Sequence, residues 1–341
     1  MKIFVTGGGG YIGTTLVPLL LEKGHAVTVL DRFYFGQESL RERSKANSKE
    51  LSMICDDTRY FEGKILEGFD AVVDMAALSN DPAGELDPWK TIEINYLGRS
   101  RVARLAREAK VKRYLLISSC SIYGFQDGII TEESKVNPLT AYARANYLAE
   151  QDNLPLGDDE FTSTVIRFAT VYGLSGRMRF DLAINGMTLG AYKTGKIPLM
   201  RDGSQWRPFI HVKDASLAIL KVLESESAKV NRQLFNIGSD SQNFQIKNLA
   251  EIVAGSLSKK PVIEWYGDPD RRSYRVSFEK AKKTLGYETK YAPSEAVKEI
   301  EDALMEGKVS DSLKTKTVEW YKHLLKDEQA SKEVTLKGSV L

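Results

Sequence analysis

The chain has 341 residues, enough to bury a large core in one large domain or in two closely joined ones. It holds 48 Lys and Arg against 46 Asp and Glu, so its charge gives no support for nucleic acid or an anionic membrane surface as a partner. The two cysteines, Cys55 and Cys120, stand at expected strand ends, and we expect buried thiols rather than a disulfide framework. The three histidines are scattered without metal-ligand spacing, so we predict no metal site.

No apolar run approaches the roughly 18 to 20 residues that a membrane-spanning helix needs. Lys2–Thr6 already has the pattern of a first strand, which is not typical of a signal peptide. We therefore expect a soluble cytoplasmic protein with no membrane partner.

The first half of the chain alternates short apolar runs with segments of helical periodicity, the pattern of βαβ units. The expected strands are Lys2–Thr6, Ala26–Asp31, Leu51–Cys55, Ala71–Met75, Arg113–Ser118 and Ser163–Arg167. Helices are expected between them, for example at Ile12–Lys23 and Thr91–Ala109. The strands are nearly continuous in apolar residues, as expected when helices cover both faces of a parallel sheet. The predicted fold class is therefore α/β, with a doubly wound parallel sheet.

After about Tyr172 the alternating pattern loosens, which predicts a smaller α/β lobe that faces the substrate. We assign residues 1–172 to the main domain, with segments from about 205–240 returning to it. The lobe takes residues 173–204 and 241–325, and Lys247–Leu257 has the pattern of an amphipathic helix. Residues 326–341 form a polar tail that we expect to be frayed.

A glycine-rich loop follows the first strand directly. Its glycines permit a tight turn, a close approach of the backbone to a pyrophosphate, and close contact between helix and sheet. The residues expected to hold the phosphates are Gly7, Gly10, Tyr11, Ile12 and Gly13. Asp31, at the end of the next strand, can accept hydrogen bonds from ribose hydroxyls and would repel a 2′-phosphate, so NAD is favoured as the cofactor. Arg32, next to it, could instead attract that phosphate, which leaves NADP as the alternative.

The glycine spacing, the segment Ser118–Gly124 and the segment Tyr142–Asn146 together resemble the extended short-chain dehydrogenase/reductase family. The resemblance is to its NAD-dependent nucleotide-sugar epimerase/dehydratase group, in the manner of UDP-galactose 4-epimerase, and it runs through most of the chain. It implies a Rossmann-type sheet with a substrate-binding lobe. It also implies that an acid binds the adenine amino group, that the segment after the fourth strand passes under the cofactor, and that an asparagine supports the active-site helix. The cofactor-binding residues implied in this way are Asp56, Asp57, Ala76, Ala77 and Asn95.

The catalytic residues implied by the resemblance are Ser119, Tyr142 and Asn146. Oxidation of a sugar hydroxyl needs a base for the O–H proton while hydride leaves the carbon. Tyr142 is the candidate base, and Ser119 would hydrogen-bond the same oxygen. The family carries Tyr-x-x-x-Lys, and this chain has Asn146 where the lysine stands. Free tyrosine has a pKa of about 10, and a cation about 4 Å away lowers such a value by nearly three units at an effective dielectric of about 20.

Asn146 leaves three interpretations open. The chain is an epimerase slowed by the loss of its cation, with Asn146 still able to bind the nicotinamide ribose. Alternatively, a cation from elsewhere, such as Arg177 or Arg179, has replaced the lysine. In the third interpretation the chain binds its ligands without turnover. Arg144 is not a candidate cation, because two residues along a helix point to opposite sides.

Two arginine-containing segments resemble the elements that bind the diphosphate of a nucleotide sugar in this family. Arg207 lies in the first, and Arg272, with Arg271 as the alternative, lies in the second. The planar guanidinium fork suits paired phosphate oxygens. The predicted substrate-binding residues are Ser121, Asn185, Arg207 and Arg272.

The reaction follows from what stands beside Ser119. Sugar-nucleotide 4,6-dehydratases of this family place Asp-Glu directly after the active hydroxyl, and this chain has Cys120 and Ser121 there. Epimerisation at C4 is therefore favoured, with a nucleotide-sugar dehydrogenase or keto-sugar reductase, or a silent binding protein, as alternatives. The resemblance also implies a homodimer built from the helices at about 91–109 and 141–153.

Overall fold

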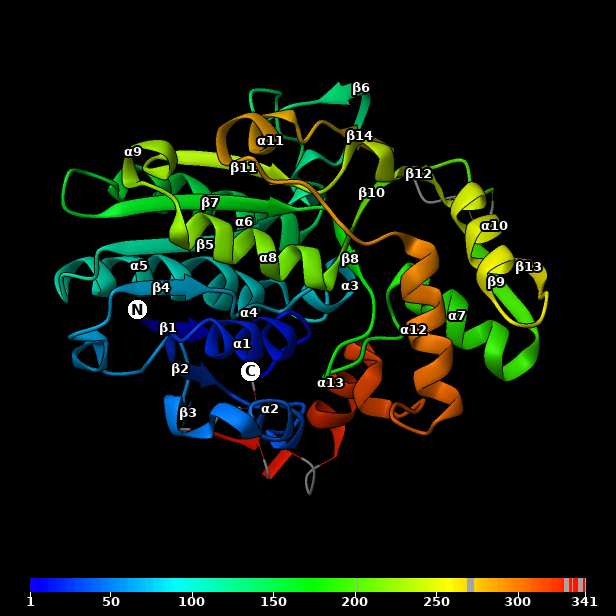
Figure 1. Ribbon diagram of the computed structural model, residues 1–341, viewed down its shortest axis with the longest axis horizontal. Coiled ribbons are helices and arrows are strands. Elements are labelled where there is room, and N and C mark those ends of the chain that lie inside the picture. Colours follow the sequence, from blue (N-terminus) through cyan, green and yellow to red (C-terminus); the bar gives the residue numbers. More distant parts are fainter. Residues whose placement is uncertain (201, 269–272, 328–330, 333, 337–339, 341) are drawn as a thin grey trace.

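A parallel sheet of seven strands lies at the centre of the molecule (Figure 1) in this computed structural model, which describes all residues except 201, 269–272, 328–330, 333, 337–339 and 341. The strands lie in the order β11-β7-β5-β4-β1-β2-β3. Their bounds are Lys2–Thr6 (β1), Ala26–Asp31 (β2), Leu51–Cys55 (β3), Ala71–Asp74 (β4), Arg113–Ser119 (β5), Thr162–Phe168 (β7) and Gln233–Ile237 (β11). The six strands expected from the sequence are all present, and β11 returns to the sheet from the second half of the chain and pairs with β7.

Helices cover both faces of this sheet, and the alternation of side chains along β1 shows how. Ile3 and Val5 join a buried cluster with side chains of α1 and α8, and Phe4 joins a second cluster with α5 and α6 on the opposite face. These helices span Gly13–Glu22 (α1), Arg99–Glu108 (α5), Ala141–Asn153 (α6) and Val212–Glu224 (α8). Each fully buried side chain of this kind stabilises the fold by about 1.5–3 kcal/mol. The predicted doubly wound α/β class is confirmed.

The segment before α5 departs from the single helix expected at Thr91–Ala109. It consists of α4 (Pro88–Ile92) and a π-helical turn at Glu93–Gly98, which continues into α5. Within this turn the Asn95 side chain accepts a hydrogen bond from Leu78 N at 2.8 Å and donates one to Leu78 O at 3.0 Å. Because π-helical turns occur mainly as short insertions and frequently at functional sites, this turn indicates that a functional site lies nearby.

A smaller lobe lies to the right of the sheet in Figure 1. Its helices α7, α10 and α12 share a buried cluster with strands β9 and β10. The bounds in this half are Thr170–Tyr172 (β8), Ala183–Thr194 (α7), Lys196–Met200 (β9), Trp206–His211 (β10), Asn243–Gln245 (β12), Ile246–Ser256 (α10), Val262–Tyr266 (β13) and Pro293–Met305 (α12). The helix α10 confirms the amphipathic helix expected at Lys247–Leu257.

The remaining elements are short or lie at the edges of the molecule. They are Glu38–Arg43 (α2), Asp81–Gly84 (α3), Phe125–Ile130 (β6), Ser227–Val230 (α9), Ser273–Val276 (β14), Glu279–Leu285 (α11) and Thr317–Lys326 (α13). Among the described residues, no helix is both long enough and apolar enough to cross a membrane.

One expectation about the cysteines was wrong. Cys120 is buried, but Cys55 is exposed. Cys55 ends β3, which is the edge strand of the sheet, and an edge strand has no neighbouring strand on its outer side.

The strand order places a topological switch point between β1 and β4. The chain runs from β1 outward to β2 and β3, and then returns to β4 on the other side of β1. In open sheets of this kind, ligands bind beyond the carboxyl ends of the strands at the switch point. The glycine-rich loop after β1 and the segment after β4 both lie there.

Candidate active site

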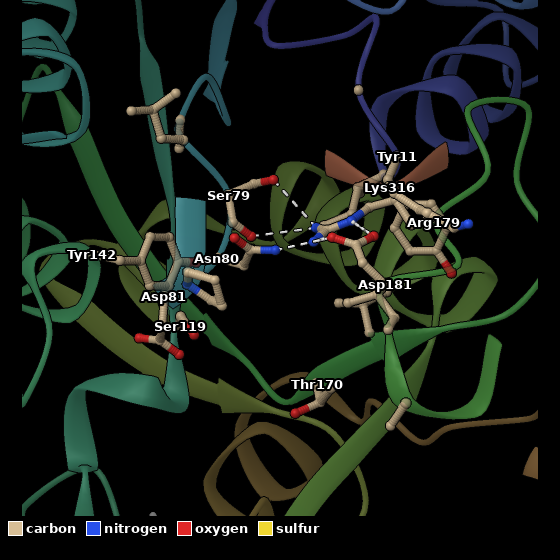
Figure 2. Close-up of a pocket in the computed structure, with 18 of the residues that line it drawn as sticks. Tyr11, Ser79, Asn80, Asp81, Ser119, Tyr142, Thr170, Arg179, Asp181 and Lys316 are labelled. Atoms are coloured by element: carbon tan, nitrogen blue, oxygen red, sulfur yellow. Dashed lines mark hydrogen bonds and ion pairs between the residues drawn. The ribbon is translucent and has the colours of Figure 1, made fainter. Parts of the chain in front are cut away.

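A cavity of about 920 Å³ lies beyond the carboxyl ends of the sheet strands and reaches into the lobe. Figure 2 shows Ser119 and Tyr142 close together on one side of it, with Arg179, Asp181 and Lys316 across from them. The glycine-rich loop contributes Gly7, Gly10, Tyr11, Ile12 and Gly13 to its lining. A single continuous space therefore joins the predicted cofactor residues to the predicted catalytic residues.

The glycine-rich loop is shaped by close backbone contacts. Gly7 has φ +72°, and a Cβ on it would lie 2.8 Å from Ala76 N, a contact closer than real side chains make. A Cβ on Gly13 would collide with the Gly8 backbone at the start of α1. The loop thus opens the N-terminal end of α1 toward the cavity, where free N–H groups and the helix dipole favour a phosphate. These residues fit a dinucleotide.

Asp31 lies at the end of β2 with its carboxylate held by the loop backbone. It accepts hydrogen bonds from Gly9 N at 2.9 Å and from Phe33 N at 2.6 Å, and burial raises the pKa of its carboxyl group. Arg32, the residue that could attract a 2′-phosphate, forms an ion pair with Asp57 at 2.7 Å and also donates to Val334 O at 2.9 Å. Because a carboxylate already neutralises Arg32, the geometry favours NAD over NADP.

Asp57 also pairs with Arg59, at 2.8 Å. Burial alone would raise the pKa of Asp57, but the hydrogen bonds and charges of Arg59 and Arg32 lower it to about 2. Asp56, the predicted adenine ligand, lines the cavity beside it.

The backbone after β4 is fixed from two sides. Thr6 Oγ1 accepts hydrogen bonds from Met75 N at 3.0 Å and Ala76 N at 3.1 Å. Asn95 holds Leu78 from behind and is buried outside the cavity lining. Ala76 and Ala77 line the cavity, as predicted, whereas Asn95 acts through the backbone that it supports.

Tyr142 and Ser119 come together from two elements. Ser119 ends β5, and Tyr142 stands in the first turn of α6, whose N-terminus is capped by Thr140 Oγ1 accepting from Ala143 N at 3.1 Å. The Ser119 and Tyr142 side chains lie close together in the cavity wall (Figure 2). Burial and the charge of Asp81 raise the pKa of the Tyr142 phenol, while Ser119, Arg99 and Arg179 lower it.

Two further features belong to the corner around Tyr142, by which we mean the part of the cavity wall formed by Ser119, Tyr142 and Asn146. Gly84, at the end of α3, lies so close to α6 that a Cβ on it would be 2.9 Å from Tyr142 Cβ. Ser121 Oγ is buried at the cavity wall and finds no hydrogen-bond partner within the described part of the chain. A buried hydroxyl without a partner is a place where a ligand can bind, which agrees with the substrate role predicted for Ser121.

Asn146 occupies the predicted position in the cavity wall, one turn after Tyr142. Its Nδ2 donates to Tyr142 O at 2.9 Å, and its Oδ1 accepts from Arg99 Nη1 at 2.8 Å. Arg99 is the first residue of α5 and is 1% exposed. A buried cation therefore stands directly behind Asn146.

The two arginines suggested by the sequence as replacement cations also line the cavity. Arg179 forms an ion pair with Asp181 at 2.8 Å. The Arg177 guanidinium lies 3.6 Å from the centre of the Phe35 ring, and burial lowers its pKa to about 9. Arg144 is exposed, as expected.

The predicted substrate residues lie in three different settings. Arg207 lines the cavity and lies over the Tyr274 ring, 5.2 Å from its centre. Asn185 is buried outside the lining, where it accepts from Gly173 N at 3.0 Å and donates to Tyr11 Oη at 3.1 Å, contacts that fix the loop after β8. Arg271 and Arg272 lie outside the described residues.

Three residues of this corner were missed by the sequence reasoning, namely Arg99, Asp81 and Gly84. A signal existed for Arg99, since it follows Asn95 by four residues and so shares the inward face of the helix. Asp81 and Gly84 belong to a four-residue helix that no periodicity in the sequence indicates.

Comparisons with known proteins agree with this geometry. A family model described as the NAD dependent epimerase/dehydratase family matches residues 3–238. The chain is 28% identical over 310 residues to the UDP-glucuronate 4-epimerase of Thermodesulfobacterium geofontis, which covers 86% of this chain and 93% of that protein. It is 28% identical over 313 residues to the UDP-glucose 4-epimerase of Lactobacillus helveticus, with 85% and 93% covered.

Two further similar proteins are a decarboxylase and a solved structure with bound ligands. UDP-glucuronic acid decarboxylase 4 of Arabidopsis thaliana is 27% identical over 305 residues, and the match covers 86% of this chain but 66% of that longer protein. The solved structure of MoeE5 in complex with UDP-glucose and NAD matches with a TM-score of 0.78 at 25% identity, covering 91% of this chain and 100% of that one.

Proposed function

Because the chain belongs to the NAD-dependent epimerase/dehydratase family, we propose that it interconverts the C4 epimers of a UDP-sugar by reversible oxidation at the sugar carbinol. The observation that carries the proposal is the proximity of Ser119 and Tyr142 in the cavity that the dinucleotide cradle also lines (Figure 2). The uridine nucleotide is supported by the relatives, several of which are named for UDP-sugars.

The cofactor end of the site uses the loop after β1 and the acid after β2. The backbone around Gly7, Gly10 and Gly13 would hold the pyrophosphate, and Asp31 would accept hydrogen bonds from the adenosine ribose. NAD bound there supplies an acceptor for the hydride of the sugar carbon and a donor for its return.

The proton steps belong to Tyr142 and Ser119. Tyr142, as phenolate, takes the proton of the C4 hydroxyl while the C4 hydrogen leaves as hydride, and the C–O single bond becomes a carbonyl. Ser119 donates a hydrogen bond to the same oxygen and so orients it. After the keto-sugar turns, hydride returns to its other face and Tyr142 gives the proton back to the oxygen.

The substrate end uses Arg207 for the diphosphate, with Ser121 as a partner for a sugar hydroxyl. Arg207 has the planar fork that suits paired phosphate oxygens. Elimination of water is disfavoured because Cys120 and Ser121 follow Ser119 in place of an acid/base pair. Burial also raises the pKa of the Cys120 thiol, which keeps that thiol protonated and so unable to accept a proton from the sugar.

We also propose that the protein is a homodimer that joins the helices at about 91–109 and 141–153. Apolar side chains near these helices support this, since Trp89, Leu97 and Leu148 are 79%, 52% and 40% exposed. Light scattering of the protein in solution would measure the mass directly. The cytoplasmic location expected from the sequence stays a prediction.

The function is tested with purified protein and a panel of UDP-glucose, UDP-galactose, UDP-N-acetylglucosamine and UDP-glucuronic acid, with product sugars and NADH followed together. The proposal predicts C4 epimers without net NADH. Net NADH would point instead to a dehydrogenase, and pentose products from UDP-glucuronic acid would point to a decarboxylase. Binding of NAD and UDP-sugar without product would point to the silent binding protein.

A further inference from the structure

Arg99 is a buried cation whose hydrogen-bond partners are all uncharged. Its guanidinium donates to Asn146 Oδ1 at 2.8 Å, to Asp74 O at 3.1 Å and to Ile117 O. Its Nε has no hydrogen-bond partner among the described residues. A guanidinium keeps its charge inside proteins, so it cannot relieve this position by losing a proton.

Asp74 is the carboxylate whose charge acts on Arg99, but its hydrogen bonds are made with other side chains. The Asp74 carboxylate accepts hydrogen bonds from Thr6 Oγ1 at 2.5 Å and from Tyr114 Oη at 2.7 Å. Burial raises the pKa of Asp74, and the charge of Arg99 opposes that rise. A buried cation without a hydrogen-bonded counter-ion is destabilising, and its presence therefore calls for a role in the site.

The geometry connects this charge to Tyr142. The Asn146 amide oxygen accepts a hydrogen bond from Arg99, and its amide nitrogen donates one to the Tyr142 carbonyl. One side chain thus links the cation to the helical turn that carries the phenol. Asn146 is in the cavity lining and Arg99 is not. Arg99 thus acts from behind the wall, without touching a ligand.

Charged groups on several elements act on the Tyr142 phenol, and they differ in whether they favour its ionised form. From α3 Asp81 raises the Tyr142 pKa, in addition to burial, and from the loop after β8 Arg179 lowers it. Arg179 is neutralised by Asp181 at 2.8 Å, whereas no such ion pair accompanies Arg99 within the described residues. Of the two arginines that lower the Tyr142 pKa, Arg99 is therefore the one whose charge no bonded carboxylate among the described residues cancels.

We infer that Arg99 is a positioning residue that, held by Asn146, supplies from the neighbouring helix the positive charge that favours the phenolate of Tyr142. The inference rests on the proposed function, in which Tyr142 is the base. It makes Asn146 one half of an arginine–asparagine pair, and the site is not an active site that has lost its cation.

The test moves the charge between the two positions in the NAD-bound holoenzyme. The variants are Arg99→Gln, Arg99→Lys, Asn146→Lys and the double variant Arg99→Gln/Asn146→Lys. The pKa of Tyr142 is measured by ultraviolet difference titration of each protein against the same protein with Tyr142→Phe, and the pH dependence of kcat is measured beside it.

We expect Arg99→Gln to raise the Tyr142 pKa by about one unit or more and to lower turnover at pH 7 about tenfold, since each pKa unit changes the phenolate fraction tenfold. Arg99→Lys should stay within a few-fold of the natural protein, and the double variant should recover most of the loss. Asn146→Lys alone places a second cation beside Arg99 and should not raise turnover. A folded Arg99→Gln protein that binds NAD with an unchanged Tyr142 pKa would overturn the inference.

Two arms keep the test decisive. If Arg99→Gln does not fold, Asn146→Lys answers alone, because a tenfold or greater gain from lysine would mean that the natural protein lacks the charge, and this would also overturn the inference. The titration requires no sugar. If Arg99→Gln raises the Tyr142 pKa as expected but no protein forms an epimer, the proposed function is rejected and the electrostatic role of Arg99 stands.

Discussion

The glycine-rich loop after β1 and the corner around Tyr142 face the same cavity but are built in different ways. In the loop, the contacts that shape the glycine turn involve residues that are close in sequence or follow adjacent strands, as Gly9 does with Asp31. In the corner, Tyr142 depends on Arg99, which lies 47 residues from its partner Asn146, and on a short helix that contains Asp81 and Gly84. Backbone shape is encoded locally, whereas charge in a buried site is supplied by whichever element packs there.

The difference explains why a motif can lose a residue without losing its chemistry. A glycine at a positive φ whose added Cβ would lie 2.8 Å from a backbone atom, as at Gly7, has no substitute elsewhere in the chain. A positive charge can be supplied from several positions in the chain, because its effect falls only gradually with distance in a medium of low dielectric. The following predictions test this contrast, from the largest expected effect to the smallest.

Replacement of Tyr142 by Phe removes the proton carrier of the corner. Turnover should fall by roughly 10²–10⁴, the usual contribution of a general base, while NAD stays bound because the loop is untouched. Tyr147→Phe, on the same helix and outside the cavity lining, is the matched control. Retention of more than a tenth of the activity in Tyr142→Phe would mean that another group moves the proton.

Replacement of Gly7 by Ala attacks the loop instead of the corner. Gly24 also has a positive φ, +78°, but has no neighbour within 4 Å of an added Cβ, so Gly24→Ala measures the backbone strain alone. Gly7→Ala should cost a further 1–3 kcal/mol or so in unfolding free energy from crowding and should weaken NAD binding at least tenfold. Calorimetric titration with NAD and chemical denaturation measure both quantities. Equal behaviour of the two variants would remove the argument from close contact.

Replacement of Asp57 by Asn tests the charges at the adenosine end. The pKa of Asp57 in the folded protein, about 2, lies below the ordinary value near 3.9, so its stabilisation is present above about pH 4 and is lost as pH falls toward 2. Asp57→Asn should therefore cost about 2 kcal/mol at pH 7 and flatten the acid side of the stability curve.

The control is Asp152→Asn, which breaks an exposed pair with Arg104 and should cost less than about 1 kcal/mol. Denaturant titrations between pH 2 and pH 7 compare the two variants. An acid limb of unchanged slope in Asp57→Asn would contradict the ion pairs described for Asp57.

Replacement of Asp81 by Asn tests the electrostatics of the corner with the smallest change. Burial and the negative charge of Asp81 both raise the Tyr142 pKa, so removal of the charge should lower it. Because the base acts as phenolate, the acid limb of the kcat profile should move to lower pH, by up to about one unit. Glu85→Gln is the control, since Glu85 accepts from Ala141 N at the start of the same helix. A shift to higher pH would reverse the assigned sign.

Much of the molecule could be predicted from the sequence, for physical reasons that are visible in particular residues. The strands were found because burial on both faces requires nearly continuous apolar runs, and the loop was found because its glycines stand at fixed offsets from β1. Ser119 and Tyr142 were found as members of a family pattern. Their union in one cavity required the sheet, which brings the end of β5 next to the start of α6.

The remainder depends on contacts that no local pattern specifies. Arg99 shares a helix face with Asn95, but only the packing of α5 against α6 shows that its guanidinium meets Asn146. The replacement cations considered from the sequence, Arg177 and Arg179, do line the cavity, yet Arg179 is bound to Asp181. The exposure of Cys55 depends on the position of β3 at the edge of the sheet, which the strand pattern alone does not fix.

The most direct test of the proposed mechanism follows the hydrogen at C4 of the sugar. UDP-glucose carrying deuterium at C4 is incubated with the purified holoenzyme in ordinary water, and the sugars are examined by mass spectrometry and NMR. Since the hydride leaves and returns within one complex, the UDP-galactose formed should carry the deuterium at C4, with none lost to the solvent. Galactose that has exchanged its C4 deuterium for solvent hydrogen would contradict reversible hydride transfer as the reaction of this protein.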